Sequence, residues 1–139
     1  MDSQALTLTF QDDIIACAIG RSGTCSKEQK TEGDGYTPIG SWPVRGALFR
    51  PGRSTPPKGF ALPWRWIGDQ DGWSDDPADP AYNRPVRLPH PFGTEALVRD
   101  DPLYDVIVVL GHNDAPPQPG KGSAMFFQVW NGGKPTDGC

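Results

Sequence analysis

Cysteine is scarce in this sequence, and so are long apolar runs. Cysteine occupies only three of the 139 positions, 17, 25 and 139. Three cysteines are too few for a disulfide framework, and one of them must stay unpaired. Cys17 and Cys25 are one candidate pair, and a buried thiol on a strand is the alternative for Cys17. Because no apolar run reaches the roughly 18 residues that a bilayer crossing requires, we expect no membrane span.

Basic clusters are also lacking. The chain has 13 Lys and Arg against 17 Asp and Glu, which gives a formal net charge of −4. Such a chain is not expected to have nucleic acid as its main partner. The first 20 residues contain three aspartates and no Lys or Arg, unlike a secretory signal. We therefore expect that the protein is not exported by the usual route, or that the sequence begins after a removed signal.

Helical periodicity is weak along the whole chain, and the best short-helix candidate is 93–100. Glycine (17 residues) and proline (16) are abundant, and proline interrupts both helices and central strands. Five Trp, six Phe and a hydrophobic share of 36% nevertheless favour a folded, loop-rich chain over a disordered one. The length fits one domain over 1–139. The composition thus predicts a mainly β fold.

Apolar alternation and β-branched runs locate the expected strands. We expect a hairpin from two strands around a turn at 11–13, a short strand within 40–49, and two strands buried on both faces near the C-terminus. The polar segments 21–36 and 111–122 are expected to be loops. The hairpin strands are 5–10 and 14–20, the buried strands are 104–110 and 124–130, and 51–91 is expected to be an ordered insertion packed by Trp64, Trp66, Trp73 and Tyr82.

The last residues carry the clearest chemistry. Cys139 follows Gly138 on a predicted turn after a strand. A sulfur there is exposed, and the two backbone N–H groups can face a developing oxyanion. Reactivity requires a thiolate, and therefore a base or a positive charge nearby. Taken alone, a cysteine near a terminus is more often inert.

Five separated segments, in this order, change that interpretation. They are Lys30–Gly40 (K-T-E-G-D-G-Y-T-P-I-G), the aromatic and acidic stretches 71–77 and 79–84, Gly111–Asp114 (G-H-N-D), Gly120–Phe127 (G-K-G-S-A-M-F-F) and Pro135–Cys139 (P-T-D-G-C). Over roughly residues 5–139 the chain resembles the L,D-transpeptidase (YkuD-type) family, in its short bacterial branch. The resemblance implies a β-sandwich or curved-sheet fold with a cleft.

The resemblance also implies a cysteine enzyme of peptidoglycan. Family members attack a stem-peptide carbonyl, form a thioester and pass the acyl group to an amine of a neighbouring stem. Cys139 would be the nucleophile, the N–H groups at Gly138 and Cys139 would hold the oxyanion, and Thr136 would shape the turn. No metal or organic cofactor is implied, carbapenems are candidate inhibitors, and the substrate places the protein in the cell envelope or periplasm.

Two positions depart from the family pattern. The family has a histidine base on the strand before the nucleophile, where this chain has Gln128. A glutamine amide cannot take up a proton near neutral pH, and general base catalysis contributes typically about 10²–10⁴-fold. Family members also continue past the cysteine with an apolar strand and a short helix, so we expect those elements to be missing after Cys139.

His112 is the alternative candidate for the base. If the strands around loop 112–123 form a hairpin, Ser123 lies nearest His112, and Gln128 lies five residues further on. That separation is roughly 17 Å, at about 3.4 Å per residue. We therefore expect His112 to have a structural or substrate-pocket role more readily than a catalytic one.

The candidate substrate-binding residues are mostly polar. Asn83 and Arg84 would bind a stem-peptide carboxylate, with an ion pair from Arg84 to Asp75, Asp76 or Asp79 as the alternative. Trp73 would line the cleft or, as we favour, pack the insertion. Thr136, Ser123 and Asn113 complete the set. Three functions remain open: an active transpeptidase, a peptidoglycan-binding pseudoenzyme that lacks the base, and a hydrolase of the same fold.

Overall fold

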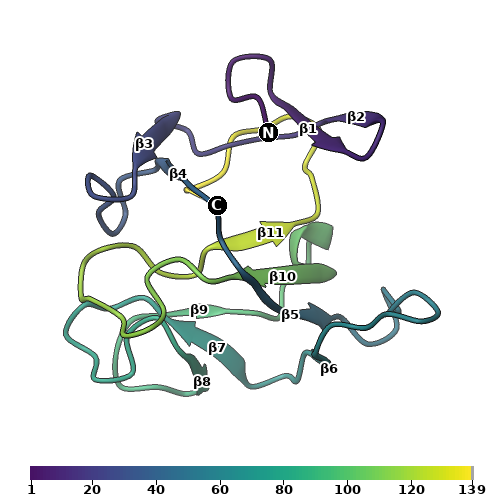
Figure 1. Ribbon diagram of the computed structural model, residues 1–139. Helices are drawn as coiled ribbons and strands as arrows, with labels where there is room; N and C mark the ends of the chain where they lie inside the picture. Colours follow the sequence, from purple (N-terminus) through teal and green to yellow (C-terminus); the bar gives the residue numbers. More distant parts are fainter. Residues whose placement is uncertain (139) are drawn as a thin grey trace.

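The computed structural model describes residues 1–138, and Cys139 lies outside the described residues. The fold is mainly β, with short strands joined by long loops. The described residues contain one helical element, a single turn of 3-10 helix, η1 (Pro102–Tyr104). Figure 1 shows the sheets stacked from the N-terminal hairpin to the strands of the central insertion. The expected mainly β fold with few helices is confirmed.

The largest sheet has four strands in the order β11 (Phe126–Gln128), β10 (Val106–Leu110), β5 (Val44–Phe49) and β6 (Trp64–Trp66). β10 is antiparallel to both of its neighbours, and β6 is parallel to β5. Ile107 lies opposite Gln128 on one side and Leu48 on the other. The β-branched run of β10 therefore lies inside the sheet, as its sequence predicts. The strand begins at Val106 rather than at residue 104, because Tyr104 belongs to η1, and Ile107 is the one residue of β10 that is buried, so the strand is not buried on both faces along its length.

Three smaller sheets surround this one. β7 (Asp71–Ser74) lies between β8 (Pro85–Arg87) and β9 (Thr94–Ala96), antiparallel to both. β1 (Thr7–Phe10) and β2 (Asp13–Ala16) form the expected hairpin. β3 (Thr24–Ser26) and β4 (Thr37–Ile39) pair in parallel. β3 lies within the segment predicted as a loop, because its three half-buried residues are too few to give a periodic signal.

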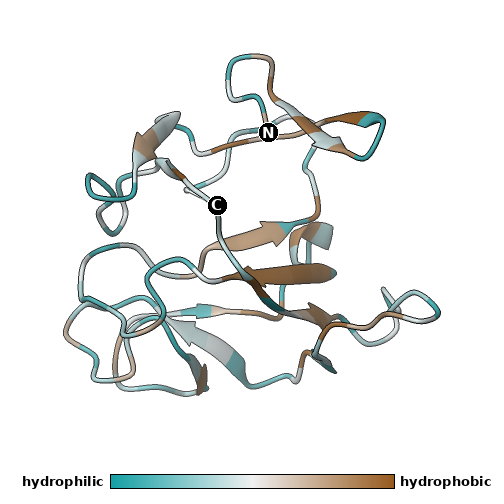
Figure 2. Ribbon diagram, in the orientation of Figure 1, coloured by the Kyte–Doolittle hydropathy of each residue, from teal (hydrophilic) through white to brown (hydrophobic). Residues whose placement is uncertain are grey.

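The hydrophobic core lies between the four-stranded sheet and the β7–β9 sheet. Figure 2 shows the apolar colouring concentrated on β5, β10 and β11. Trp73 of β7 packs against this core from the other side, with its ring edge-to-face on Phe126 at a centroid distance of 5.1 Å. The buried members are Leu48, Ile67, Leu97, Tyr104, Ile107, Ala124 and Phe126.

Several local predictions were wrong. Residues 94–96, within the predicted short helix 93–100, form strand β9, because they pair with β7 and bring Leu97 fully into the core. The strand near residue 126 is shorter than 124–130 and is not buried on both faces, since β11 is an edge strand with Phe127 50% exposed. Cys17 and Cys25 are both free and half-buried, so the candidate disulfide does not form.

The tryptophans of the insertion divide into two groups. Trp73 packs against the core through Phe126, and the nearby Tyr82 is buried, so these two aromatic residues anchor the insertion to the rest of the chain. Trp64 and Trp66 do not, because they lie on the edge strand β6, where they are 42% and 44% exposed. Their rings contact each other edge-to-face, with centroids 5.3 Å apart.

Candidate functional site

A cavity of about 720 Å³ lies between the N-terminal hairpin, strand β11 and the C-terminal segment. Its lining mixes apolar residues of β11 with polar and charged side chains brought from distant parts of the sequence. The polar lining includes Lys30, Glu32, Asp75, Glu95, Ser123, Gln128 and Thr136, and Gly138 is also part of the lining. The cavity thus brings together residues of the predicted motifs at 30–40, 120–127 and 135–139.

The C-terminal turn is held against the loop that follows β2. Thr136 donates its backbone N–H to the Ile19 carbonyl at 2.9 Å, and its own carbonyl accepts from Arg21 N–H at 2.8 Å. Asp137 and Arg21 form an exposed ion pair. Gly138 is buried with a φ of 131°, and its N–H donates to Thr136 Oγ1 at 3.3 Å. Thr136 therefore shapes the turn, and Gly138 N–H already has a partner.

Lys30 is buried directly beside this turn, with 3% of its surface exposed. A Cβ placed on Gly138 would lie 3.2 Å from Lys30 Nζ, and one placed on Gly122 would lie 3.0 Å from the lysine chain. Both glycines have positive φ angles. The lysine chain therefore passes close to two glycines at which a side chain would be strained, and Lys30 is buried although it lies in the polar segment predicted to be a loop.

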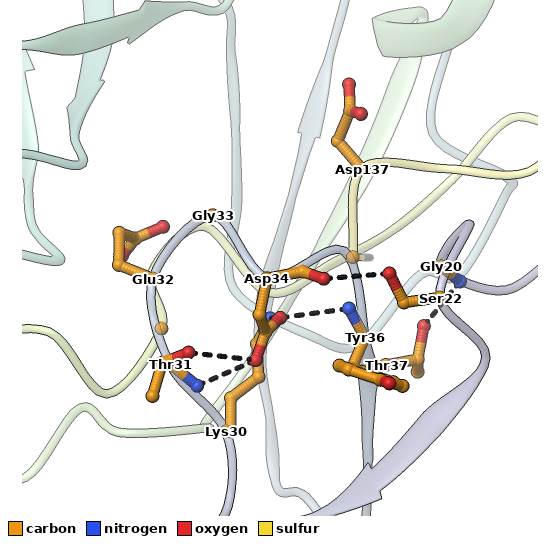
Figure 3. A network of polar contacts seen from close by, with 12 residues as sticks. Gly20, Ser22, Lys30, Thr31, Glu32, Gly33, Asp34, Tyr36, Thr37 and Asp137 are labelled. Carbon is orange, nitrogen blue, oxygen red and sulfur yellow. Dashed lines mark hydrogen bonds and ion pairs between the residues drawn. The ribbon is translucent and has the colours of Figure 1, made fainter.

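Asp34 is the ion-pair partner of Lys30, at 2.5 Å from Nζ to Oδ1 (Figure 3). Its carboxylate also accepts the backbone N–H groups of Thr31 at 2.8 Å and Tyr36 at 2.9 Å. Burial works against the charged form, but the hydrogen bonds from Lys30 and from these two N–H groups hold the pKa of Asp34 below its ordinary value. The loop is thus organised around one buried ion pair.

Glu32 connects this loop to the insertion. The Tyr82 hydroxyl donates a hydrogen bond to Glu32 Oε2, and Glu32 N–H donates to the Gly120 carbonyl at 2.9 Å. Burial and the adjacent Glu32 carboxylate raise the pKa of Tyr82, so the phenol stays protonated. The Glu32–Tyr82 contact therefore joins a lining residue of the cavity to the insertion, between segments that lie far apart in the sequence.

Gln128 lines the cavity from strand β11, opposite Ile107. Its Oε1 atom is buried and has no hydrogen-bond partner within residues 1–138, and the same is true of Ser123 Oγ. Buried polar atoms without partners are costly. Two such atoms on one cavity wall are the kind of group that a polar ligand satisfies.

His112 does not reach Gln128, as the strand register predicts. It lies beyond the end of β10, with only 4% of its surface exposed, and its ring edge contacts Trp42 at a centroid distance of 4.8 Å. Its Nε2 donates to the Lys121 carbonyl at 2.9 Å. Burial lowers the pKa of the imidazole. Among the described residues, His112 is not part of the cavity lining, and its contacts are structural.

Asn83 and Asn113 also hold the loop after β10 rather than project into the cavity. Asn83 is buried with a φ of 55°, and its side chain donates to the carbonyls of His112 at 3.1 Å and Asn113 at 2.7 Å. Its Oδ1 accepts Trp73 Nε1 at 2.9 Å and Ala124 N at 3.1 Å. The Asn113 amide donates to the carbonyls of Gln118 and Gly122.

Arg84 and Trp73 likewise contact the protein itself. Arg84 is exposed and donates to the backbone carbonyl of Asp114 at 2.7 Å, so the ion pair expected as its alternative is not formed. Trp73 packs on the core instead of lining the cavity. Of the six candidate substrate-binding residues, the cavity contains Ser123 and Thr136.

Sequence reasoning missed the acidic wall of the cavity. Burial raises the pKa of Glu95, which accepts the Tyr104 hydroxyl, and burial and Glu32 raise that of Asp75. Glu95 was not identifiable because its segment was predicted to be a helix, whereas strand alternation places it on the cavity side. Only the pairing of β9 with β7 would have located Glu95 in this wall.

Within residues 1–138, no group of three or more His, Cys, Asp or Glu side chains could hold a metal ion. No helix of that part is long and apolar enough to cross a membrane. Comparisons of the chain with protein-family models, curated proteins and solved structures found no match.

Proposed function

We propose that this protein is a cysteine L,D-transpeptidase that acts on peptidoglycan stem peptides in the cell envelope, with Cys139 as its nucleophile. The observation that carries the proposal is the position of Gly138, the residue bonded to Cys139. It is buried and lines a cavity of about 720 Å³, to which the resembling segments 30–40, 71–77 and 120–127 also contribute lining residues. A cavity of this size accommodates a short peptide segment.

In the proposed reaction, the thiolate attacks a stem-peptide carbonyl. A C–S bond forms, the C–N bond of the substrate breaks, and the leaving amine takes up a proton. An amine of a second stem then attacks the thioester and forms a new C–N bond, while the C–S bond breaks, the thiolate is released and the amine nitrogen gives up a proton to solvent. The buried, unpartnered oxygens of Gln128 and Ser123 are suited to bind N–H groups of the peptide.

Gln128 also supports a second candidate function. A glutamine at the position of the expected base gives the thiol no proton acceptor, which favours a pseudoenzyme that binds stem peptides without acylation. The two candidates differ in one chemical property, the nucleophilicity of Cys139.

Intact mass after incubation with a carbapenem tests the proposal. We expect an adduct of one drug molecule that the Cys139→Ala variant does not form. Cys17 also lines the cavity, so Cys17→Ser is the matched control and should still form the adduct. No adduct on folded protein would favour the pseudoenzyme, and an adduct lost in Cys17→Ser would contradict the proposed nucleophile.

Transfer and hydrolysis are separated by the products. Incubation with a stem tetrapeptide and an amine acceptor, followed by mass spectrometry, should give the cross-linked peptide. Release of the free acid alone would instead indicate a hydrolase of the same fold.

A further inference from the structure

We propose that strand β6 and the loop before it form a surface that binds the interface of an anionic lipid bilayer. This β6 patch consists of Leu62, Trp64 and Trp66, with Lys58 in the loop that precedes them. The described residues that line the cavity include none from 50–66. Figure 1 shows β6 at the lower right, away from the N-terminal hairpin. The β6 patch is therefore separate from the cavity and independent of the proposed chemistry.

The apolar part of the β6 patch lies on the outer side of the four-stranded sheet. Leu48 of β5 belongs to the core, and it pairs with Arg65 of β6. Because side chains alternate along a strand, Trp64 and Trp66 project to the opposite side of the sheet. They are 42% and 44% exposed, and Leu62 is 40% exposed. Adjoining exposed apolar side chains of this size mark an interaction surface.

The two tryptophan rings are held by aromatic contacts beneath them. The Trp64 ring contacts buried Phe49 edge-to-face at a centroid distance of 5.8 Å, and Phe49 contacts Phe60 in the same way at 5.7 Å. The Trp64 and Trp66 rings meet at 86°, so they offer no single flat platform for stacking. Fixed, half-exposed indole rings are instead suited to the boundary between water and lipid, where tryptophan is enriched in proteins.

The sequence around the β6 patch has the opposite charge balance from the rest of the chain. Between Asp34 and Asp69, residues 35–68 contain five basic side chains and no acidic one, and the rest of the chain has eight basic and 17 acidic side chains. The positive charges are spread along the segment instead of clustered. They are Arg45, Arg50, Arg53, Lys58 and Arg65.

Ion pairs neutralise only part of this charge. Arg45 and Arg53 each have an acidic partner on another segment. Arg65 shares the single carboxylate of Asp71 with Arg87, so two guanidinium groups face one negative charge. This group keeps a positive charge at the edge of the sheet.

Lys58 and Arg50 add to the remaining positive charge. Among residues 1–138, neither forms an ion pair. Lys58 is exposed, and half-buried Arg50 donates to the backbone carbonyl of Arg99 at 3.1 Å. Apolar aromatic surface combined with unpaired basic groups is complementary to an anionic bilayer, because apolar burial and attraction to the lipid headgroups act together.

The same charges disfavour a second copy of this chain as the occupant. Two β6 edges that paired around a two-fold axis would bring their Arg65 side chains opposite each other, which is destabilising. Arg65 also donates to the carbonyl of Trp66 at 2.9 Å, so one acceptor of the short strand is already used.

The test is flotation of the protein with vesicles made of equal parts phosphatidylglycerol and phosphatidylcholine, compared with vesicles of phosphatidylcholine alone. We expect binding to the anionic vesicles only, and weaker binding as the salt concentration rises. Trp66→Gln should weaken the binding about tenfold or more, through lost apolar contact. Lys58→Gln should weaken it about fivefold.

Two matched controls change the same residue types elsewhere. Trp130→Gln alters a tryptophan that is 49% exposed beyond the opposite edge strand, β11, and Lys27→Gln alters an exposed lysine next to β3. Both should bind the anionic vesicles like the unmodified protein. Circular dichroism checks that each variant folds. If Trp66→Gln does not fold, the result for Lys58→Gln, an exposed loop residue, decides the proposal.

Three outcomes would overturn the proposal: no flotation with anionic vesicles at low salt, equal flotation with phosphatidylcholine alone, or unchanged binding in folded Trp66→Gln. Sedimentation velocity without lipid tests the other occupant. A dimer that Trp66→Gln abolishes would assign the β6 patch to a second copy of the chain instead. Because vesicle binding needs no acyl transfer, its failure would leave the proposed function untouched, and the reverse also holds.

Discussion

Gln128 is the residue at which the proposed chemistry is most easily strengthened. It lines the cavity from β11, and its Oε1 has no partner within residues 1–138. We expect Gln128→His to speed carbapenem acylation by about 10²–10⁴-fold, because an imidazole there can accept the thiol proton. The measurement is the rate of adduct formation by intact mass.

The control for this substitution places a histidine elsewhere. Gln118→His changes an exposed residue of the loop after β10 and should leave the rate unchanged. An unchanged rate in a folded Gln128→His protein would mean that position 128 does not face the nucleophile.

Single residues also mark the limit of sequence reasoning about the site. Gln128 could be assigned because it belongs to a strand with a recognisable pattern. The burial of Lys30 could not be predicted, since a lysine in a polar, glycine-rich segment has the appearance of a solvated residue. Its burial comes from Gly122 and Gly138, which lie far away in the sequence. Asn83 was likewise predicted to bind substrate, and its structural role could not be predicted because the four side-chain hydrogen bonds that hold it join residues 10 to 41 positions away.

Among the elements, β10 is the strand on which the fold depends most. Its β-branched run was sufficient to predict it, and it pairs with β5 and β11. Ile107 at its centre is fully buried. We expect Ile107→Ala to lower the free energy of unfolding by about 2–5 kcal/mol, through lost apolar contact and the remaining cavity. Urea unfolding followed by tryptophan fluorescence measures the change.

Ile14→Ala is the matched substitution on a peripheral strand. Ile14 lies on β2 and is 73% exposed, so its loss should change the free energy of unfolding by no more than about 0.5 kcal/mol. Similar losses for both variants would contradict the assignment of the core to the space between the two larger sheets.

The short strands were harder to predict than β10, for a physical reason. β3, β4, β6, β8 and β9 contain three residues each, too few for alternation to be distinguished from chance. Their positions are fixed by pairing with distant partners. The segment at β9 has local features that suited a helix, and the hydrogen bonds with β7 determined the outcome.

For the whole molecule, the acidic groups divide into two sets with opposite effects on stability. Asp71 belongs to the first set. Burial opposes its charge, but Arg65, the Gly68 N–H and Arg87 together hold its pKa below the ordinary value. Its contribution to the free energy of unfolding is therefore present above its pKa in the unfolded chain, about 3.9, and is lost as the pH falls through its lower pKa in the folded protein. Glu95 belongs to the second set, because burial raises its pKa.

The contribution of Glu95 has the opposite sign. It is present below the pKa of Glu95 in the unfolded chain, about 4.3, and is lost as the pH rises through its higher pKa in the folded protein.

We expect Asp71→Asn to lower the free energy of unfolding near neutral pH and to flatten its fall in acid. Glu95→Gln should raise that free energy near neutral pH, since the amide still accepts the Tyr104 hydroxyl without burying a charge. Urea unfolding from pH 3 to 7 measures both profiles, with Asp12→Asn, in the exposed β1–β2 turn, as the control that should follow the unmodified protein. If both variants were destabilised to the same degree at every pH, the two residues would act through packing alone. Opposite changes that converge in acid would mean that the buried carboxyl groups, and not only the apolar core, set the pH range in which this fold is stable.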